Sequence, residues 1–236
     1  MNKSKGIVVA AVILGLATVI LGLCLKAGID NFSDRDRVVT VKGLCEKEVA
    51  ANKVTWPIVT KEVGNDLPTI YERIQASNDA ILAFLKSNGI PAEEIAVNAP
   101  QVFDQAAERY ASQNVAYRYT VTNVVVVTSG KVDKVKDLMG KQTELLKQGI
   151  AVVAGDYNYA TLYEYTGLNT IKPEMIVEAT ANARTAADKF AEDSHSKLGK
   201  IKTASQGQVT IEDRDQYTPD VKTVRVVTSI TYYLED

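Results

Sequence analysis

Few residues in this chain have the types and spacing that catalysis requires. The 236 residues include one histidine, His195, and two cysteines, Cys24 and Cys45. A zinc site with two or three histidine ligands is therefore excluded. The sequence contains no HExxH, CxxC, GxSxG or P-loop motif. We predict no catalytic residue, no cofactor-binding residue and no metal ligand.

The single histidine lies in the segment Asp193-Ser194-His195-Ser196. A catalytic role would pair it with Asp193 and a serine, but residues two apart do not face each other on a helix. A cation near a helix C-terminus is stabilised by the helix dipole. We interpret His195 as a surface residue near the end of a helix.

Paired acidic residues occur at Glu93-Glu94 and on both sides of Arg214, in Asp213-Arg214-Asp215. The first pair is typical of a solvated helix start, and the second group is typical of a surface turn. A calcium loop supplies oxygen ligands at regular spacing, and neither group has that spacing. We predict structural roles for both groups.

Tyrosines alternate in one segment and form the most distinctive pattern in the chain. Thr161 lies in the middle of the series, and the tyrosines are Tyr157, Tyr159, Tyr163 and Tyr165. On a strand these four side chains would share one face. One interpretation is ordinary aromatic packing over a core. The alternative is a contact surface, because tyrosine is enriched at protein interfaces.

The sequence pattern predicts three helices in residues 37–236. The first runs from Leu67 to Asn88, with Asp66 as its cap and Gly89 after its end. The second covers residues 131–147. The third covers residues 173–198 and carries a stripe of small residues that predicts close packing, namely Ile176, Ala179, Ala183, Ala187 and Phe190.

Segments with strand periodicity lie between these helices. They cover residues 38–41, 54–59, 95–103, 117–128, 151–165, 202–211 and 223–234. The run Val124–Val127 predicts a strand buried on both faces, and Pro57 predicts an edge or bulged position. Hairpins alternate with helices in the order ββ-α-ββ-α-β-α-ββ. We therefore predict an α+β fold with antiparallel-rich mixed sheets and three helices, in addition to an N-terminal transmembrane helix.

The N-terminus is apolar over Gly6–Leu25, without a charged residue. About 20 apolar residues suffice for a helix to cross a bilayer. Lys3 and Lys5 precede the run and favour a cytoplasmic N-terminus. We predict a signal anchor over residues 1–27, a linker over 28–36 and a folded region over 37–236. A cleaved signal peptide remains an alternative, as does a lipoprotein signal, although Leu23 precedes Cys24 where a small residue is expected.

The charge balance also limits the possible partners. The formal net charge is −2, and residues 37–236 contain no block of basic residues. Nucleic acid is therefore not an expected partner. Cys45 is the only cysteine after the apolar run, so residues 37–236 cannot form an internal disulfide, and we interpret Cys45 as a small buried hydrophobe.

Small-residue and strand patterns recur along the chain in residues 38–66, in residues 163–169, in the IKPEMI…KLGKI region and in the RVVTSITYYL strand. These segments resemble the SIMPL-domain family, which includes bacterial periplasmic immunogenic and oxidative-stress-defence proteins. The resemblance implies an exported α+β domain that forms ring- or channel-like oligomers and has a role in envelope stress. It implies no active site. A glycine is usual in the family at the position of His195.

The sequence thus predicts a non-enzymatic, self-assembling envelope protein, anchored to the inner membrane with residues 37–236 outside the cytoplasm. A ligand-binding module that uses the tyrosine-rich face or an oligomer cavity is the second interpretation. A hydrolase is the third and least supported interpretation, because the polar groups for acid–base or nucleophilic chemistry are absent.

Overall fold

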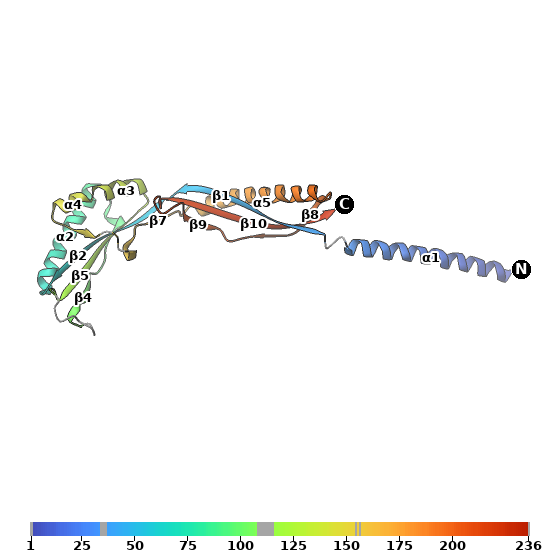
Figure 1. The fold of residues 1–236 in the computed structure, drawn as a ribbon, viewed down its shortest axis with the longest axis horizontal. Coiled ribbons are helices and arrows are strands. Elements are labelled where there is room, and N and C mark those ends of the chain that lie inside the picture. Colours follow the sequence, from blue (N-terminus) through green and yellow to red (C-terminus); the bar gives the residue numbers. More distant parts are fainter. Residues whose placement is uncertain (1, 34–36, 108–115, 154, 156, 236) are drawn as a thin grey trace. The chain divides into compact units, whose positions relative to one another are not determined.

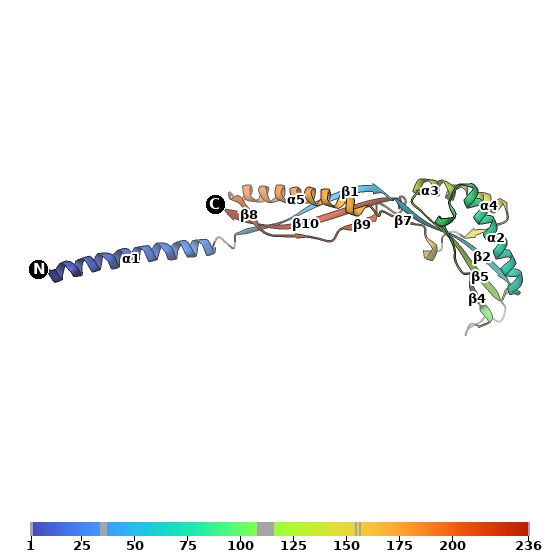
Figure 2. The same cartoon turned by 180° about the vertical axis from the view of Figure 1, so that it is seen from behind.

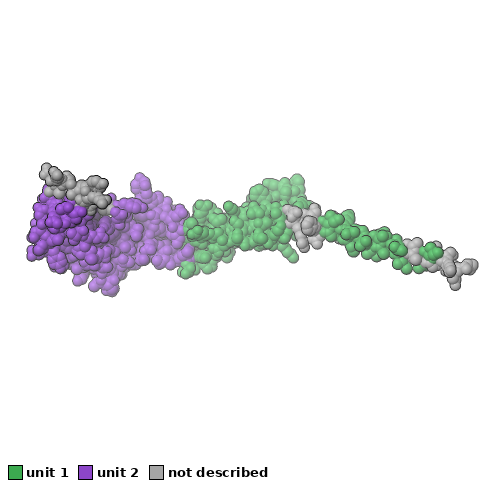
Figure 3. Space-filling view, turned by 90° about the horizontal axis from the view of Figure 1, so that it is seen from below, with its two compact units in different colours: residues 1–47, 169–210, 224–236 green, residues 48–168, 211–223 purple. Residues whose placement is uncertain are grey.

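The structure is a computed structural model that describes residues 2–33, 37–107, 116–153, 155 and 157–235. The chain divides into two compact units. Unit 1 comprises residues 1–47, 169–210 and 224–236, and unit 2 comprises residues 48–168 and 211–223 (Figure 3). Strands β1 (Val38–Ala50), β9 (Thr210–Asp213) and β10 (Val221–Glu235) contribute residues to both units.

The N-terminal segment forms the helix α1, Asn2–Ser33. The helix continues past residue 27, so the part of the predicted linker up to Ser33 is helical, and residues 34–36 lie outside the described residues. Large apolar side chains of α1 are exposed, including Leu14, Leu16 and Leu23. Judged by length and hydropathy over the residues that the structure describes, no helix qualifies as a membrane span.

Unit 1 is built on a sheet of order β1-β10-β8, with β9 also paired to β10. Strand β8 covers Lys197–Gln206 and runs antiparallel to β10. The helix α5, Leu168–Asp193, lies alongside β1 and β10 in both ribbon views (Figures 1 and 2). The predicted third helix is therefore confirmed, but it begins five residues before Pro173 and ends before residue 198.

The alanine stripe of α5 explains how closely this helix packs on the sheet. Ala179, Ala183 and Ala187 are fully buried. A Cβ atom at Gly43 of β1 would lie 1.8 Å from the carbonyl oxygen of Ala179, so only glycine fits at that position. The ends of the predicted stripe are wrong, because Phe190 is exposed and Met175, rather than Ile176, is buried.

Unit 2 is built on two long antiparallel strands, β2 (Lys53–Gly64) and β5 (Tyr119–Ser129), which are separated in the chain by α2, β3 and β4. They pair antiparallel without a bulge from Val54–Ser129 to Gly64–Tyr119. The short strands β3 (Ile95–Val97) and β4 (Gln101–Asp104) pair with β5. The short strands β6 (Val152–Val153) and β7 (Leu162–Glu164) pair with β2.

This arrangement confirms the interior position predicted for the valine run. Strand β5 lies between β3 and β2, and Val124, Val125 and Val127 are all buried. Pro57 is not bulged, because its pairing with Val126 continues the regular register. On its other side, Pro57 lies in a break between β6 and β7, where β2 has no partner in the described pairings.

Three helices cover one face of the unit 2 sheet. They are α2 (Leu67–Ser87), α3 (Val132–Lys141) and α4 (Thr143–Lys147). The predicted cap is confirmed, since the backbone N–H of Thr69 donates to Asp66 Oδ2 at 3.0 Å. The main core joins these helices to the sheet through Trp56, Ile58, Leu85, Val125 and Leu138, among others.

The prediction of three helices after the N-terminus is wrong, because residues 131–147 form two helices that are divided at Gln142. The N–H of Gln142 bonds Met139 three residues back, at 3.4 Å, rather than four residues back. Gly140 is a poor helix former, which favours the break there. Within the described residues the order is α-ββ-α-βββ-αα-ββ-α-βββ, together with short 3₁₀ turns. In unit 1, β8 pairs antiparallel with β10, and in unit 2, β2 and β5 pair antiparallel with each other and with the short strands. The α+β class is therefore confirmed.

A buried polar cluster crosses the interface between α2 and the sheet. Asn123 Nδ2 donates to Asn78 Oδ1 at 2.7 Å and to Thr60 Oγ1 at 3.3 Å. All three side chains are buried, and Asn123 Oδ1 has no hydrogen-bond partner among the residues that the structure describes. The polar interruption at Asn78 in the apolar stripe of α2 is thus matched by an amide on β5.

Candidate functional site

One candidate site is a hollow of about 400 Å³ at the break between β6 and β7. Val59 pairs with Val153, whereas Thr55 pairs with Leu162. Residues 56–58 of β2 therefore correspond to the longer segment 154–161 on the other side. This difference makes the segment an insertion in what would otherwise be one continuous strand.

The side chains around the hollow come from three parts of unit 2. Strand β2 provides Trp56 and Pro57, the α3–α4 region provides Met139 and Gln142, and the inserted segment provides tyrosines. The lining includes Trp56, Pro57, Met139, Gln142, Tyr157 and Tyr159. Sequence reasoning missed Trp56, Met139 and Gln142. Pro57 in mid-strand was the available signal, because a residue that cannot donate a ladder hydrogen bond marks a place where pairing stops.

The four tyrosines do not share the single strand face that the alternation predicts. Tyr157 and Tyr159 lie in the 3₁₀ turn η4, Tyr157–Tyr159, and only Tyr163 lies in β7. Residues 154 and 156 of the predicted strand lie outside the described residues. The expected common face is therefore wrong, because the insertion interrupts the strand. The interface role of these residues remains a prediction.

The four side chains also have different environments. Tyr157 is 94% exposed, and Tyr159 is partly buried. Tyr163 packs against the main core, and its hydroxyl donates to Met139 Sδ at 3.7 Å. Burial raises the pKa of the Tyr163 hydroxyl. The hydroxyl of Tyr165 donates to the carbonyl oxygen of Gly167 at 3.2 Å. Only Tyr157 and Tyr159 thus belong to the hollow.

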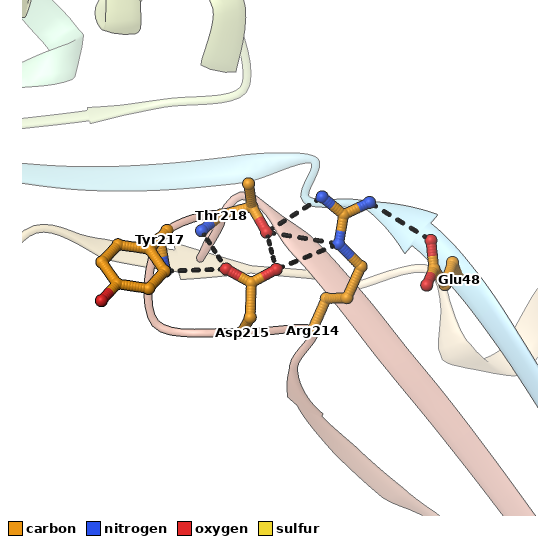
Figure 4. Close-up of polar contacts among 5 residues, drawn as sticks. All are labelled: Glu48, Arg214, Asp215, Tyr217 and Thr218. Atoms are coloured by element: carbon orange, nitrogen blue, oxygen red, sulfur yellow. Dashed lines mark hydrogen bonds and ion pairs between the residues drawn. The ribbon is translucent and has the colours of Figure 1, made fainter.

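A second polar cluster surrounds Arg214 and is shown in Figure 4. Asp215 Oδ1 accepts from the backbone N–H groups of Tyr217 and Thr218, each at 2.8 Å, and Oδ2 accepts from the Thr218 hydroxyl. Arg214 Nη1 lies 3.4 Å from Glu48 Oε2. Both carboxylate oxygens of Asp215 are therefore occupied by the turn that they stabilise, as expected for the predicted surface turn.

The hydrogen bonds of this turn also explain the pKa of Asp215. Hydrogen bonds from the Thr218 hydroxyl and the Tyr217 backbone N–H lower the pKa of Asp215 to about 2. The charged form is favoured because the donors are already oriented towards it. Asp213, the other acid of this group, pairs with the Lys222 ammonium. These contacts describe a structural turn.

His195 lies just beyond the end of α5, as a helix-ending residue. Its backbone is left-handed, with φ of 54°, and its N–H donates to the carbonyl oxygen of Glu192 at 3.0 Å. Glycine is the residue that this position favours. The helix therefore ends at Asp193 and not at the predicted residue 198, and the side chain of His195 is exposed.

The remaining reactive groups do not form a site. Cys45 is buried, as predicted, and burial together with the neighbouring Glu178 raises the pKa of its thiol to about 11. A thiol with that pKa is protonated at neutral pH and is a poor nucleophile. Across the residues that the structure describes, no group of three or more His, Cys, Asp or Glu side chains is placed to hold a metal ion.

Comparison with known families places this architecture in a defined class. The fold is an α+β protein with two antiparallel sheets, and a model of the SIMPL family, described as a protein of unknown function (DUF541), matches residues 39–232. The chain therefore belongs to the SIMPL family, as the sequence resemblance indicated. No curated protein gives a significant match to the chain.

Proposed function

We propose that this SIMPL protein is a non-enzymatic cell-envelope protein that self-assembles and supports tolerance of envelope or oxidative stress. Its N-terminal helix tethers it to the inner membrane, with residues 37–236 in the extracytoplasmic space. The uncharged run Gly6–Leu25 within α1 supports the tether, because its length matches a hydrocarbon core about 30 Å thick.

The open edges of the unit 1 sheet carry the proposal of self-assembly. In the order β1-β10-β8, the outer strands are the 13-residue β1 and the 10-residue β8. Every residue of β8 from Lys200 to Gln206 is exposed. An outer strand of this length can present backbone N–H and C=O groups to another chain, and monomeric proteins usually shorten or cover such edges. Pairing between copies would satisfy these groups.

Two neighbouring proline variants test the role of the β8 edge. Consecutive residues of a strand direct their N–H groups to opposite sides, so only one of Thr203→Pro and Ala204→Pro removes a hydrogen bond to β10. Native mass spectrometry of the full chain, released from detergent micelles, counts the copies. We expect the variant that remains folded to lose the assembly. If both proline variants fold and neither changes the number of copies in the assembly, β8 is not the contact between copies.

A reporter fusion tests the topology separately. A phosphatase that is active only outside the cytoplasm, fused after Asp236, should be active. A cytoplasm-only reporter at the same position should be inactive, and its activity would refute the proposed orientation. Deletion of the gene should reduce stress tolerance. The full chain should restore it, whereas residues 37–236 expressed without α1 should not. This result would connect the tether with the stress role.

A second function is favoured by the hollow in unit 2. Two of the tyrosines that the sequence singled out, Tyr157 and Tyr159, lie beside a hollow of about 400 Å³. Ligand pockets are typically about 300–1,000 Å³ in volume and combine aromatic side chains with a few polar groups. Ligand binding at this hollow is compatible with self-assembly through unit 1, because the residues involved are different.

A further inference from the structure

A second groove, of about 200 Å³, lies in unit 2 between α2 and the short strand β4. Three of its lining side chains are buried and pack together as a small apolar cluster, namely Ile70, Ile74 and Val121. Three more are exposed apolar side chains, namely Leu67, Tyr71 and Val102. All the residues that line this groove belong to the described part of the chain.

The chemistry of the lining determines which part of a ligand can enter. The side chains around the groove are hydrocarbon, apart from the hydroxyl of Tyr71. That hydroxyl already accepts a hydrogen bond from Gln75 Nε2, at 2.9 Å. A polar group that entered the groove would lose hydrogen bonds to water without gaining others, whereas apolar groups bind in apolar hollows. The bound part of a ligand is therefore hydrocarbon.

The groove is elongated along the axis of α2. Leu67 and Ile74 line it on the helix and lie two helical turns apart, about 10 Å along the axis. On the sheet side, Val102 pairs with Val121, and Pro100, two residues before Val102, continues the lining. The lining residues thus follow the helix on one side and the strands on the other.

These dimensions fit one extended hydrocarbon chain. A volume of about 200 Å³ over a length of about 10 Å gives a mean cross-section of about 20 Å², which is that of a single alkyl chain. Because a C–C bond of about 1.5 Å advances an extended chain by about 1.3 Å, the groove holds about eight carbon atoms. A lipid with two chains would leave its second chain in water, so the volume selects an amphiphile with one chain.

We propose that the groove between α2 and β4 binds the chain of a single-chain amphiphile over about eight carbon atoms. The head group stays in water at the open side of the groove. The α2 residues between Tyr71 and Ile74 are Glu72 and Arg73, which carry opposite charges, so neither sign of head group is selected by them. This binding is independent of the functions proposed above, because the groove lies in unit 2 and shares no lining residue with the hollow at the β6–β7 break.

Titration of the full chain in lipid nanodiscs tests this site. Detergent is avoided, because its own alkyl chain would compete for the groove. Methyl NMR of isoleucine follows Ile70 and Ile74 in the groove, and Ile230 in the core of unit 1 is the internal reference. Octan-1-ol is the probe, and its free concentration in water is measured in each sample, because part of it enters the bilayer. We expect saturable shifts at Ile70 and Ile74 and none at Ile230.

A series of alcohols tests the shape of the bound group. From hexan-1-ol to octan-1-ol, Kd should fall about two- to fourfold for each added methylene, because each one removes more apolar surface from water. From decan-1-ol to dodecan-1-ol, Kd should fall by less than about twofold in all, since the added carbons extend beyond the groove. Cyclooctanol, the cyclic alcohol of the same carbon number as octan-1-ol, should bind at least about tenfold more weakly, because its ring is wider than the groove.

A matched pair of variants assigns the binding to the groove. Val102→Asp places a carboxylate in the lining, and we expect it to raise Kd at least about tenfold. Val97→Asp on β3 is the control, because Val97 is 47% exposed, close to the 55% of Val102, but does not line the groove. It should leave Kd unchanged. If circular dichroism shows that Val102→Asp does not fold, Leu67→Asp provides the same test, because an acidic residue is favoured in the first turn of a helix.

Each outcome decides the proposal. Saturable binding of octan-1-ol that is weakened by Val102→Asp, but not by Val97→Asp, and that levels off with chain length supports it. Absence of saturable binding overturns it. Equal binding of cyclooctanol overturns the extended chain, and a Kd that keeps falling equally through dodecan-1-ol overturns the length. Binding that survives in both Val102→Asp and Leu67→Asp, or that Val97→Asp weakens equally, places the site elsewhere and also overturns the proposal.

Discussion

The buried cluster of Asn78, Asn123 and Thr60 makes a quantitative prediction about coupling between α2 and the sheet. In Asn123→Val, the Oδ1 atom of Asn78 loses its 2.7 Å donor while it remains buried. An unsatisfied buried polar group costs about 1–3 kcal/mol. We expect Asn123→Val to lower the free energy of unfolding by about 2 kcal/mol, and Asn78→Leu to lower it by a similar amount.

The double variant should behave differently from the sum of the two single variants. Each single replacement leaves the other amide buried without its 2.7 Å partner, whereas replacing both amides leaves neither group unpaired and also removes Asn123 Oδ1, which has no hydrogen-bond partner within the described residues. We expect Asn78→Leu/Asn123→Val to lie within about 1 kcal/mol of the wild type, which corresponds to a coupling free energy of at least about 3 kcal/mol.

Urea unfolding followed by fluorescence of Trp56 measures this cycle directly, because Trp56 belongs to the core that the cluster adjoins. Thr60→Val serves as a control, since it removes only the longer 3.3 Å contact and should cost less than either amide. Single-variant losses that add up in the double variant would refute the reasoning. That result would mean that the amides contribute independently to stability.

Three further predictions concern single positions. Gly43→Ala should destabilise unit 1 by about 3 kcal/mol or more, measured by thermal melting, because the added Cβ would overlap the Ala179 carbonyl; an unchanged melting temperature would refute the close packing of α5. His195→Gly should stabilise the fold by about 0.5–1 kcal/mol, because glycine adopts positive φ without strain, and a loss of stability would contradict this role. The pKa of Asp215 is depressed from 3.8 to about 2, so the stability that its charge contributes is complete above pH 4 and disappears as the pH falls through 2. Asp215→Asn should therefore lose less stability than the wild type between pH 4 and pH 2, as followed by circular dichroism, and equal losses would refute the assignment.

Much of the fold follows from local patterns in the sequence. Asp66 and Gly89 mark the ends of α2, and the alanines at spacing of four in α5 predict its close approach to a sheet. The valine run of β5 predicts its interior position. These features depend on residues close together in the chain, and local rules describe them well.

Two of the failures concern the ends of helices. The helix α5 ends at Asp193, and His195 follows in a left-handed conformation, although periodicity alone extends the helix to residue 198. The segment 131–147 divides at Gln142, close to Gly140, a poor helix former. Helical spacing indicates which face of a helix is buried and not where the helix ends, so neither boundary could be placed from it.

The candidate site shows the same limit more clearly. Alternation singled out Tyr157 and Tyr159, but it placed them on a strand with Tyr163 and Tyr165, whereas the structure places them in a 3₁₀ turn. The insertion becomes visible only when the registers of β6 and β7 against β2 are compared. Trp56 and Gln142 could not be assigned to the site from sequence, since they are distant in the chain from the tyrosines.

The insertion between β6 and β7 has a consequence for how this protein can diverge. Strands β2 and β5 keep an unbroken register that does not depend on residues 154–161. Changes in the length or composition of that segment cost mainly loop-closure entropy, which grows slowly with length. Selection can therefore reshape the rim of the hollow in small steps while the paired scaffold stays intact. Among descendants of this chain, we expect variation in sequence and length to concentrate in this segment, and Pro57 to persist wherever the insertion persists.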